Sequence, residues 1–104
     1  MQDFLWTQIQ DIGPSARAGH GAAHDTVRSR TVVFGGLDAG PLGDTWELVD
    51  DLWTQVEDIG PSARHACAMA FDAARGHVIL FGGESGTSLF GDTWRWDGQH
   101  WTQI

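Results

Sequence analysis

The 104-residue chain contains no lysine, no tyrosine and only one cysteine. A single cysteine excludes an intrachain disulfide, so the fold has to be stabilised by packing and hydrogen bonds. The absence of lysine leaves six arginines against 14 acidic residues, and the formal net charge is −8. This charge disfavours nucleic acid and anionic membranes as partners, because both attract clustered positive charge on a protein.

Long apolar segments are absent as well. No run approaches the ~20 apolar residues of a membrane-spanning helix. The N-terminal stretch MQDFLWTQIQ has neither the basic start nor the long apolar segment of a signal peptide. No compartment is indicated, and a cytoplasmic location is the default expectation. Cys67 lies among alanines in an expected strand, which favours a small buried side chain over a reactive thiol.

Glycine and tryptophan are abundant, with 14 and six residues respectively, and they recur at a regular spacing. The phrase WTQIQDIGPSAR, which begins at Trp6, returns as WTQVEDIGPSAR at Trp53 and starts again as WTQI at Trp101. The interval from Trp53 to Trp101 exceeds the interval from Trp6 to Trp53 by a single position. Self-similarity at such a period is typical of repeat architectures, in which one supersecondary unit packs on the next.

The two intervals differ because one residue is inserted between two further repeated motifs. The Gly-Gly pair at 35–36 returns at 82–83, which matches the shorter interval. The GDTW motif that ends at Trp46 returns at Trp94, which matches the longer one. The insertion therefore lies in ESGTSLF of the second copy, which replaces LDAGPL of the first. A segment that tolerates an insertion is expected to be a surface loop.

Each copy contains four expected strands. They span 17–25, 31–34, 44–49 and 52–57 in the first copy and 64–72, 77–81, 92–97 and 100–104 in the second, and a relative of the fourth strand, 4–10, precedes the first copy. The second strands are short apolar β-forming runs that end in Gly-Gly, which indicates burial on both faces. Four antiparallel strands in about 47 residues, repeated, are typical of β-propeller blades. Small residues then fit the first strands near a central axis, and tryptophans fill the wider gaps outside.

On these motifs the chain resembles the kelch repeat, which is marked by a double glycine at the end of its second strand and two spaced aromatics on its third and fourth strands. The matching residues are Gly35, Gly36, Trp46 and Trp53 in the first copy and Gly82, Gly83, Trp94 and Trp101 in the second. The PSAR and GDTW motifs look like the bacterial form of the repeat. Kelch repeats often carry tyrosine in the aromatic pair, and here tryptophan takes that place. The resemblance covers nearly the whole chain.

The WD-repeat propeller is the alternative. Gly19-His20 and Trp96-Asp97 look like its two signatures, but neither recurs at the matching position of the other copy. A signature that belongs to a repeat should be present in each repeat. We therefore favour the kelch-type propeller.

We expect an all-β chain of two four-stranded antiparallel kelch-type β-propeller blades, with an extra N-terminal outer strand. Residues 1–10 would form an outer strand of a preceding blade, residues 11–57 the first blade and residues 58–104 the second. The resemblance implies a ring of about five to seven blades. Two blades leave two open apolar faces, so we expect the chain to associate with itself or with further blades of a longer protein. The terminal strands would then compete for one edge.

The sequence contains no pattern that predicts a metal site, a cofactor or a catalytic group. His20 and His24 are four positions apart, which is roughly 13 Å along a strand, and the other histidines lie in different strands. Asp44 and Asp92 of the GDTW motifs are expected to accept hydrogen bonds from nearby backbone groups in turns, although a catalytic carboxylate is an alternative. We therefore predict a protein that is not an enzyme.

Candidate binding residues lie in the loops and at the start of the first strands. Arg17 and Arg64 could satisfy carbonyl groups or the motif aspartates, or could bind an anion at the mouth of a channel. Asp38, Glu84 and Ser85 lie in the loops that differ between the copies, at the end where Arg64 is also expected. The resemblance implies that kelch propellers commonly bind partners with loops of this face. An ordinary solvated loop explains the same residues.

The sequence thus predicts a non-catalytic module for protein binding or propeller assembly. Its expected partners are further copies of itself, further kelch blades of a parent protein, or a protein or peptide ligand. Two alternatives stay open: a fragment of a larger kelch propeller enzyme, and an artificial chain made to study propeller assembly.

Overall fold

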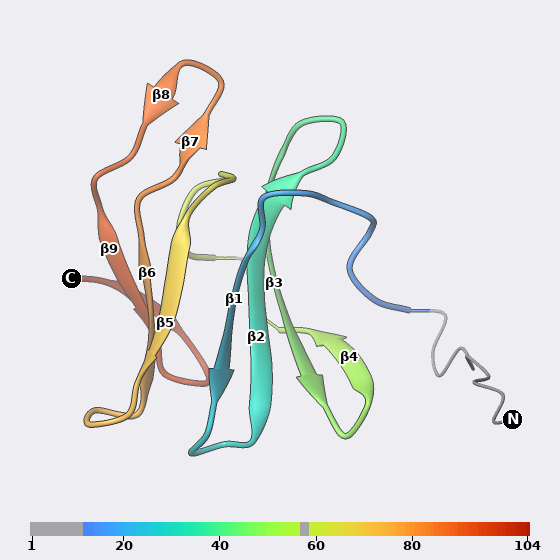
Figure 1. Cartoon of the computed structure of the whole chain (residues 1–104), viewed down its shortest axis with the longest axis vertical. Helices are drawn as coiled ribbons and strands as arrows, with labels where there is room; N and C mark the ends of the chain where they lie inside the picture. The colour runs from blue at the N-terminus through green and yellow to red at the C-terminus, as the bar shows by residue number, and fades with distance from the viewer. Residues whose placement is uncertain (1–11, 57–58) are drawn as a thin grey trace, which may run out of the picture.

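The structure is a computed structural model, and it describes residues 12–56 and 59–104 (Figure 1). Sheet 1 contains β1 (Gly21–Asp25), β2 (Arg30–Leu37), β3 (Pro41–Val49) and β4 (Leu52–Gln55). Sheet 2 contains β5 (Ala68–Asp72), β6 (His77–Phe81), β9 (Thr93–Trp96) and β10 (Trp101–Gln103), and a hairpin of β7 (Glu84–Ser85) and β8 (Ser88–Leu89) lies between β6 and β9. The predicted all-β fold with two four-stranded antiparallel sheets is confirmed. The described residues include no helix that is long and apolar enough to cross a membrane.

Each sheet is an antiparallel meander; the strands of sheet 1 follow each other directly along the chain, and in sheet 2 the β7–β8 hairpin intervenes between β6 and β9. The turn between β3 and β4 consists of Asp50 and Asp51, both with positive φ (50° and 67°), as expected for a two-residue hairpin turn. The loop of the second copy that carries the one-residue insertion forms the β7–β8 hairpin, which projects from one end of sheet 2 as the predicted surface loop (Figure 1).

Strand β2 is longer than predicted, because it does not end at the double glycine. Gly35 and Gly36 have φ values of 68° and 114°, and they form a bulge through which β2 continues to Leu37. A bulge bends a strand without ending its pairing, so β3 also starts earlier than predicted, at Pro41. In sheet 2 the strand ends at Phe81, before the glycines, as predicted.

The first strands start later than predicted, at residues 21 and 68 instead of 17 and 64. The reason is a residue with positive φ in each copy, Gly19 (68°) and Ala66 (60°), which interrupts an extended strand. Before this residue each segment makes only an isolated bridge. The outer strand predicted at 4–10 and the boundary predicted between the two blades at 57–58 lie outside the described residues.

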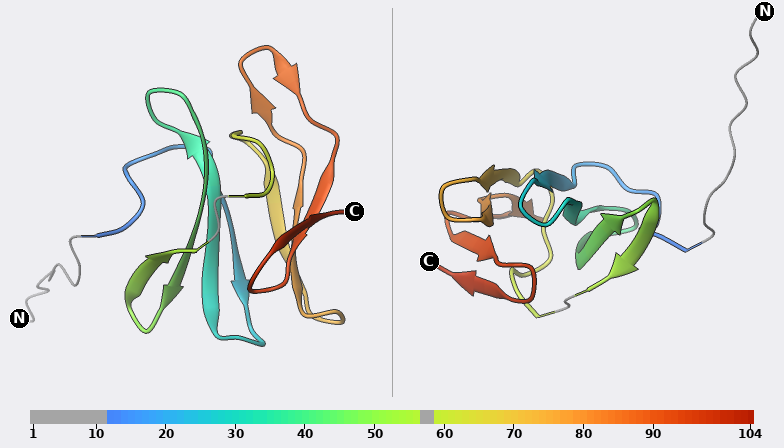
Figure 2. Two further views of the ribbon diagram at one scale, coloured as in Figure 1. Left: turned by 180° about the vertical axis from the view of Figure 1, so that it is seen from behind. Right: turned by 90° about the horizontal axis from the view of Figure 1, so that it is seen from below.

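The two sheets pack face to face, with β1 and β5 close together and the outer strands β4 and β10 farther apart (Figure 2). Small residues on β1 permit this approach. A Cβ atom at Gly21 would lie 2.5 Å from the Met69 sulfur and 3.0 Å from the Cys67 sulfur. The small residues of the first strands therefore let the sheets converge, as the sequence predicts.

The core lies between the two sheets. Val32 and Phe34 of β2 pack against residues of sheet 2, namely Val78, Leu80, Trp96 and Trp101. The Trp101 ring meets Phe34 edge-on with centroids 5.5 Å apart, and it lies 5.4 Å from the Trp96 ring. Such pairs stabilise a fold beyond the area they bury. The predicted role of tryptophan as filler of the wider gap is confirmed for Trp96 and Trp101.

Candidate functional site

Sheet 2 contains a largely buried cluster of Arg64, Asp92 and Trp94. Arg64 donates to both carboxylate oxygens of Asp92, at 2.6 and 3.0 Å, and to the Gly82 carbonyl at 3.1 Å. The Trp94 indole N–H donates to the same carboxylate at 2.7 Å. A bidentate arginine–carboxylate pair of this kind is strong and geometrically specific. We call this cluster the Arg–Asp–Trp lock.

Sheet 1 contains the same lock, built from Arg17, Asp44 and Trp46. The Arg17–Asp44 distances are again 2.6 and 3.0 Å, and the Trp46 indole N–H donates to Asp44 at 2.7 Å. Because the same distances recur in both sheets, the lock belongs to the architecture of each repeat. The motif aspartates accept hydrogen bonds, but mainly from arginine and tryptophan side chains and not from the turn backbone groups that the sequence predicted.

The locks hold both carboxylates in the charged form. Hydrogen bonds from Arg64 lower the pKa of Asp92 from 3.8 to about 2, against the opposing effect of partial burial. At Asp44, burial raises the pKa, but the hydrogen bonds from Arg17 and Trp46 outweigh it and the pKa is lowered. A permanently ionised carboxylate that is saturated with donors is unsuited to general acid–base work near neutral pH.

The geometry favours the structural interpretation of Arg17 and Arg64 over anion binding. The Arg64 side chain is 1% exposed, and its guanidinium also stacks on the Phe90 ring at 4.0 Å. Each arginine additionally donates to the backbone carbonyl and hydroxyl of a serine two positions earlier. Every nitrogen of the two guanidinium groups thereby has an acceptor inside the protein.

The structure does not gather the loop candidates into one site. Asp38 is exposed in the connection between β2 and β3 of sheet 1. Glu84 and Ser85 lie on β7, where Glu84 pairs with His65 through its backbone and approaches the His65 ring at 3.7 Å. The two connections project from the same end of the molecule (Figure 1). Their role in binding stays a prediction.

The described residues show neither a group of metal-binding side chains nor an activated cysteine. In 12–56 and 59–104, no three His, Cys, Asp or Glu side chains are grouped so as to hold a metal ion. Cys67 is partly buried against the core between the sheets, and burial raises the pKa of its thiol. This environment is consistent with a filler side chain.

Two cross-sheet hydrogen bonds show how one sheet binds the next. The Trp101 indole N–H donates to the Thr45 hydroxyl at 2.9 Å, and the Trp96 indole N–H donates to Glu47 at 3.1 Å. Glu47 is itself held by Arg30 at 2.8 Å. Both indole N–H groups are buried in the contact, so they reach these acceptors only when the two sheets pack together.

The ends of the strands add further cross-sheet contacts. Arg28 of sheet 1 binds Asp25 at 2.9 Å and reaches across to the Gly76 carbonyl of sheet 2 at 2.7 Å. At the opposite end of the strands, the Gly36 N–H donates to the Arg64 carbonyl at 2.9 Å. Contacts from both ends of the strands fix the register between the sheets.

Each sheet has two chemically different faces. The face that carries Phe34 in sheet 1 and Phe81 in sheet 2 is called the Phe face, and the opposite face, which carries the tryptophans, is called the Trp face. Within the chain, the Phe face of sheet 1 (Val32, Phe34, Thr45, Glu47) packs on the Trp face of sheet 2 (Val78, Leu80, Trp96, Trp101). The remaining Phe face of sheet 2 (Ile79, Phe81, Thr93, Arg95) and Trp face of sheet 1 (Thr31, Val33, Leu48, Trp53) are not covered by another sheet of the described residues, although Val33 is only 7% exposed.

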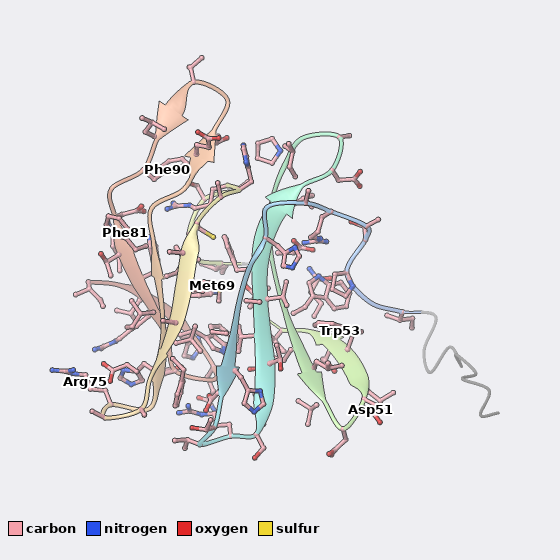
Figure 3. All side chains as sticks on the ribbon, viewed as in Figure 1. Asp51, Trp53, Met69, Arg75, Phe81 and Phe90 are labelled. Carbon is pink, nitrogen blue, oxygen red and sulfur yellow. The ribbon has the colours of Figure 1, made fainter. Side chains whose placement is uncertain are left out.

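Two open apolar faces were predicted from the sequence, but the strand pattern alone did not identify the residues that line them. Phe34 is 1% exposed, whereas its counterpart Phe81 in the second copy is 53% exposed. Phe81 and Arg75 lie on one side of the molecule, and Trp53 and Asp51 lie on the opposite side (Figure 3). The Trp face of sheet 1 also has a pocket of about 270 Å³, lined by Pro14, Ser15, Arg17, His20, Val33 and Trp53. The sequence does contain a signal for these residues. Equivalent positions of the two copies are a constant distance apart along the sequence on each side of the insertion, so each residue in the contact between the sheets has a counterpart on an open face.

No protein-family model matches the chain, and no curated protein matches it at a significant level.

Proposed function

We propose that the chain is a non-catalytic module of two kelch-type propeller blades, and that its function is to bind further blades and so complete a ring. Sheet 1 and sheet 2 would be the two blades. The ring would be completed by further copies of the chain. Three copies would supply six blades, within the range that the kelch resemblance implies.

The observation that carries this proposal is the exposure of Phe81 at the position equivalent to the buried Phe34. Inside the chain, a Phe face is covered by the Trp face of the next sheet, and the contact is lined by aromatic rings and satisfied polar groups. Soluble monomers rarely leave such surfaces bare. A chain that carries one face of each kind open is suited to bind more of the same architecture.

The locks support a structural role for the motif residues in place of catalysis. Their arginines and aspartates are bound to each other in both sheets. In the part of the chain that the structure describes, the repeated polar side chains of the motifs serve to shape each sheet. The module would therefore act through its surfaces.

Size-exclusion chromatography with light scattering tests the proposal. A ring of three copies would have three times the mass of the 11.4 kDa chain, and dilution should convert it to smaller species. A protein that stays a well-behaved monomer of 11.4 kDa at all accessible concentrations would contradict self-association. In that case, only binding to blades of another chain would remain.

A further inference from the structure

We propose that the Phe face of sheet 2 binds the Trp face of sheet 1 of a second copy, in the same register in which the two sheets pack inside the chain, with Arg75 pairing to Asp50 of that copy. The inference rests on the proposed self-association and names the partner and the pairing. Such head-to-tail contact is heterologous, and repeated copies of it form a closed ring or an open chain.

The backbone of sheet 2 is already shaped for this contact. At Gly35 an added Cβ atom would lie 2.5 Å from the Arg64 carbonyl oxygen of the neighbouring sheet. Gly82 is its counterpart and has nearly the same φ, 71° against 68°, but its added Cβ would meet only the Phe90 carbonyl oxygen, at 3.4 Å. The space that Arg64 fills beside Gly35 is therefore open beside Gly82. By the repeat, Arg17 of a second copy would fill it.

The open Phe face also has the counterpart of an arginine that spans the two sheets. Arg28 holds Asp25 and crosses to sheet 2, where its side chain lies beside Gly98. Its counterpart Arg75 holds Asp72 in the same way, at 3.1 Å, but its side chain is 74% exposed. The open face thus carries an arginine that is placed to span a contact, and within residues 12–56 and 59–104 no second sheet lies in its reach.

In the internal register, the residue that replaces Gly98 opposite Arg75 is Asp50 of the second copy, followed by Asp51. Asp50 is exposed in the turn between β3 and β4. In the contact between copies, Arg75 would therefore face the acidic turn at Asp50, whereas in the contact inside the chain Arg28 faces Gly98. This charge complementarity favours a second copy as the partner, because both groups are supplied by the same sequence.

At a second position the combined side-chain length is matched. Inside the chain, Glu47 accepts a hydrogen bond from Trp96. In the copy-to-copy contact, the equivalent residues are Arg95 and Leu48. On the Phe face, the longer Arg95 stands in the place of Glu47. On the Trp face, the smaller Leu48 stands in the place of Trp96. The combined length of the two side chains across the contact is therefore kept.

The contact between copies is expected to be weaker than the internal one. The internal Trp face includes Phe71, Val78 and Trp96, whereas the open Trp face has His24, Thr31 and Leu48 at the equivalent positions, which bury less apolar area. Association should therefore depend on concentration, and single substitutions on the open faces should be sufficient to abolish it.

Two variants, each blocked on one face, test the pairing. Phe81→Glu places a charge on the open Phe face, and Leu48→Arg places a cation opposite Arg95 on the open Trp face. Each variant alone should be a folded monomer of 11.4 kDa. An equimolar mixture should give a dimer of twice that mass, because one intact Phe face and one intact Trp face remain. Leu89→Glu, at an 81% exposed position on the β7–β8 hairpin, is the control and should associate like wild type.

The outcomes separate this inference from the proposed function. If wild type associates but Phe81→Glu still associates alone, or the mixture forms no dimer, the head-to-tail pairing is wrong and self-association stands. If wild type is a monomer, self-association itself is wrong.

A charge exchange covers the case in which a blocked variant fails to fold, because Arg75 and Asp50 are both on the surface. Arg75→Asp and Asp50→Arg should each raise the dissociation constant about tenfold by placing like charges together, and the double variant should restore it. Additive weakening in the double variant, or no change in the single variants, would overturn the pairing.

Discussion

At the scale of single residues, the Arg–Asp–Trp lock explains why PSAR and GDTW recur together. The aspartate carboxylate accepts hydrogen bonds from an arginine at the start of the repeat and from the tryptophan that follows the aspartate by two positions. The charged pair is largely removed from water, where an ion without its partner is costly. Each motif is therefore required by the other, although 28 residues separate Arg64 from Asp92 in sheet 2.

The lock predicts the effect of Asp92→Asn. The substitution leaves the buried Arg64 charge without its counterion, and we expect a loss of about 3 kcal/mol in the free energy of unfolding at pH 7. The folded-state pKa of Asp92 is lowered to about 2, so its contribution is present above about pH 4 and is lost as the pH falls through about 2. The difference between wild type and variant should narrow over this range.

Urea unfolding followed by tryptophan fluorescence at several pH values measures this difference. Asp92→Asn and the control Asp72→Asn are both compared in the Phe81→Glu background, because Arg75, the largely exposed partner of Asp72, lies in the proposed contact between copies. The control should be close in stability to its Phe81→Glu parent. An Asp92→Asn protein as stable as that parent at pH 7 would contradict the structural role of the lock.

At the scale of elements, the double glycines are needed because their backbone has positive φ. Gly35 is also needed because a side chain there would collide with the neighbouring sheet. Gly35 and Gly82 have nearly the same positive φ, but only Gly35 is covered by the neighbouring sheet, through the Arg64 carbonyl. The two positions therefore separate the strain of the backbone from the cost of a collision between sheets.

Alanine substitutions should show this separation. We expect Gly82→Ala to cost about 1 kcal/mol through backbone strain alone, and Gly35→Ala to cost at least twice as much. Gly76→Ala is the matched control, since Gly76 has φ of 72° and open space around it. Chemical unfolding in the Phe81→Glu background measures all three without a contribution from association. Equal costs for Gly35→Ala and Gly82→Ala would contradict the collision.

Much of the element structure was predictable from the sequence, and the misses have physical causes. The glycine spacing and the apolar runs located the strands, because strand-forming residues and turn residues are read locally. The later start of β1 and β5 was missed, since it depends on positive φ at Gly19 and Ala66, and alanine does not indicate such a conformation. The open faces were predicted in kind, but their residues depend on which face of each strand meets the other sheet.

At the scale of the whole molecule, the proposed association predicts that stability depends on protein concentration. The core lies between the sheets, and it is built from one Phe face and one Trp face. A second copy would bury the remaining two faces in the same way. Since a partner that binds only the folded state stabilises that state, the folded chain should gain stability from its own concentration.

The midpoint of thermal unfolding should therefore rise with protein concentration. We expect an increase of several degrees for wild type between low and high micromolar concentration, and no increase for Phe81→Glu. Circular dichroism melts over this range provide the measurement. A wild-type midpoint that does not change with concentration would contradict the coupling of association to folding.

The β7–β8 hairpin has a consequence for any assembly of copies. The first repeat has a shorter equivalent, in which β2 and β3 stay paired out to Leu37 and Pro41, and one additional residue lengthens the hairpin in the second repeat. A ring built from copies would carry the longer hairpin on every other blade. The hairpins would therefore repeat once per copy, whereas the four-stranded sheets repeat twice per copy. A ligand that grasps the hairpin would then meet one identical site per copy, evenly spaced around the ring, and a multivalent ligand would gain avidity from the arrangement.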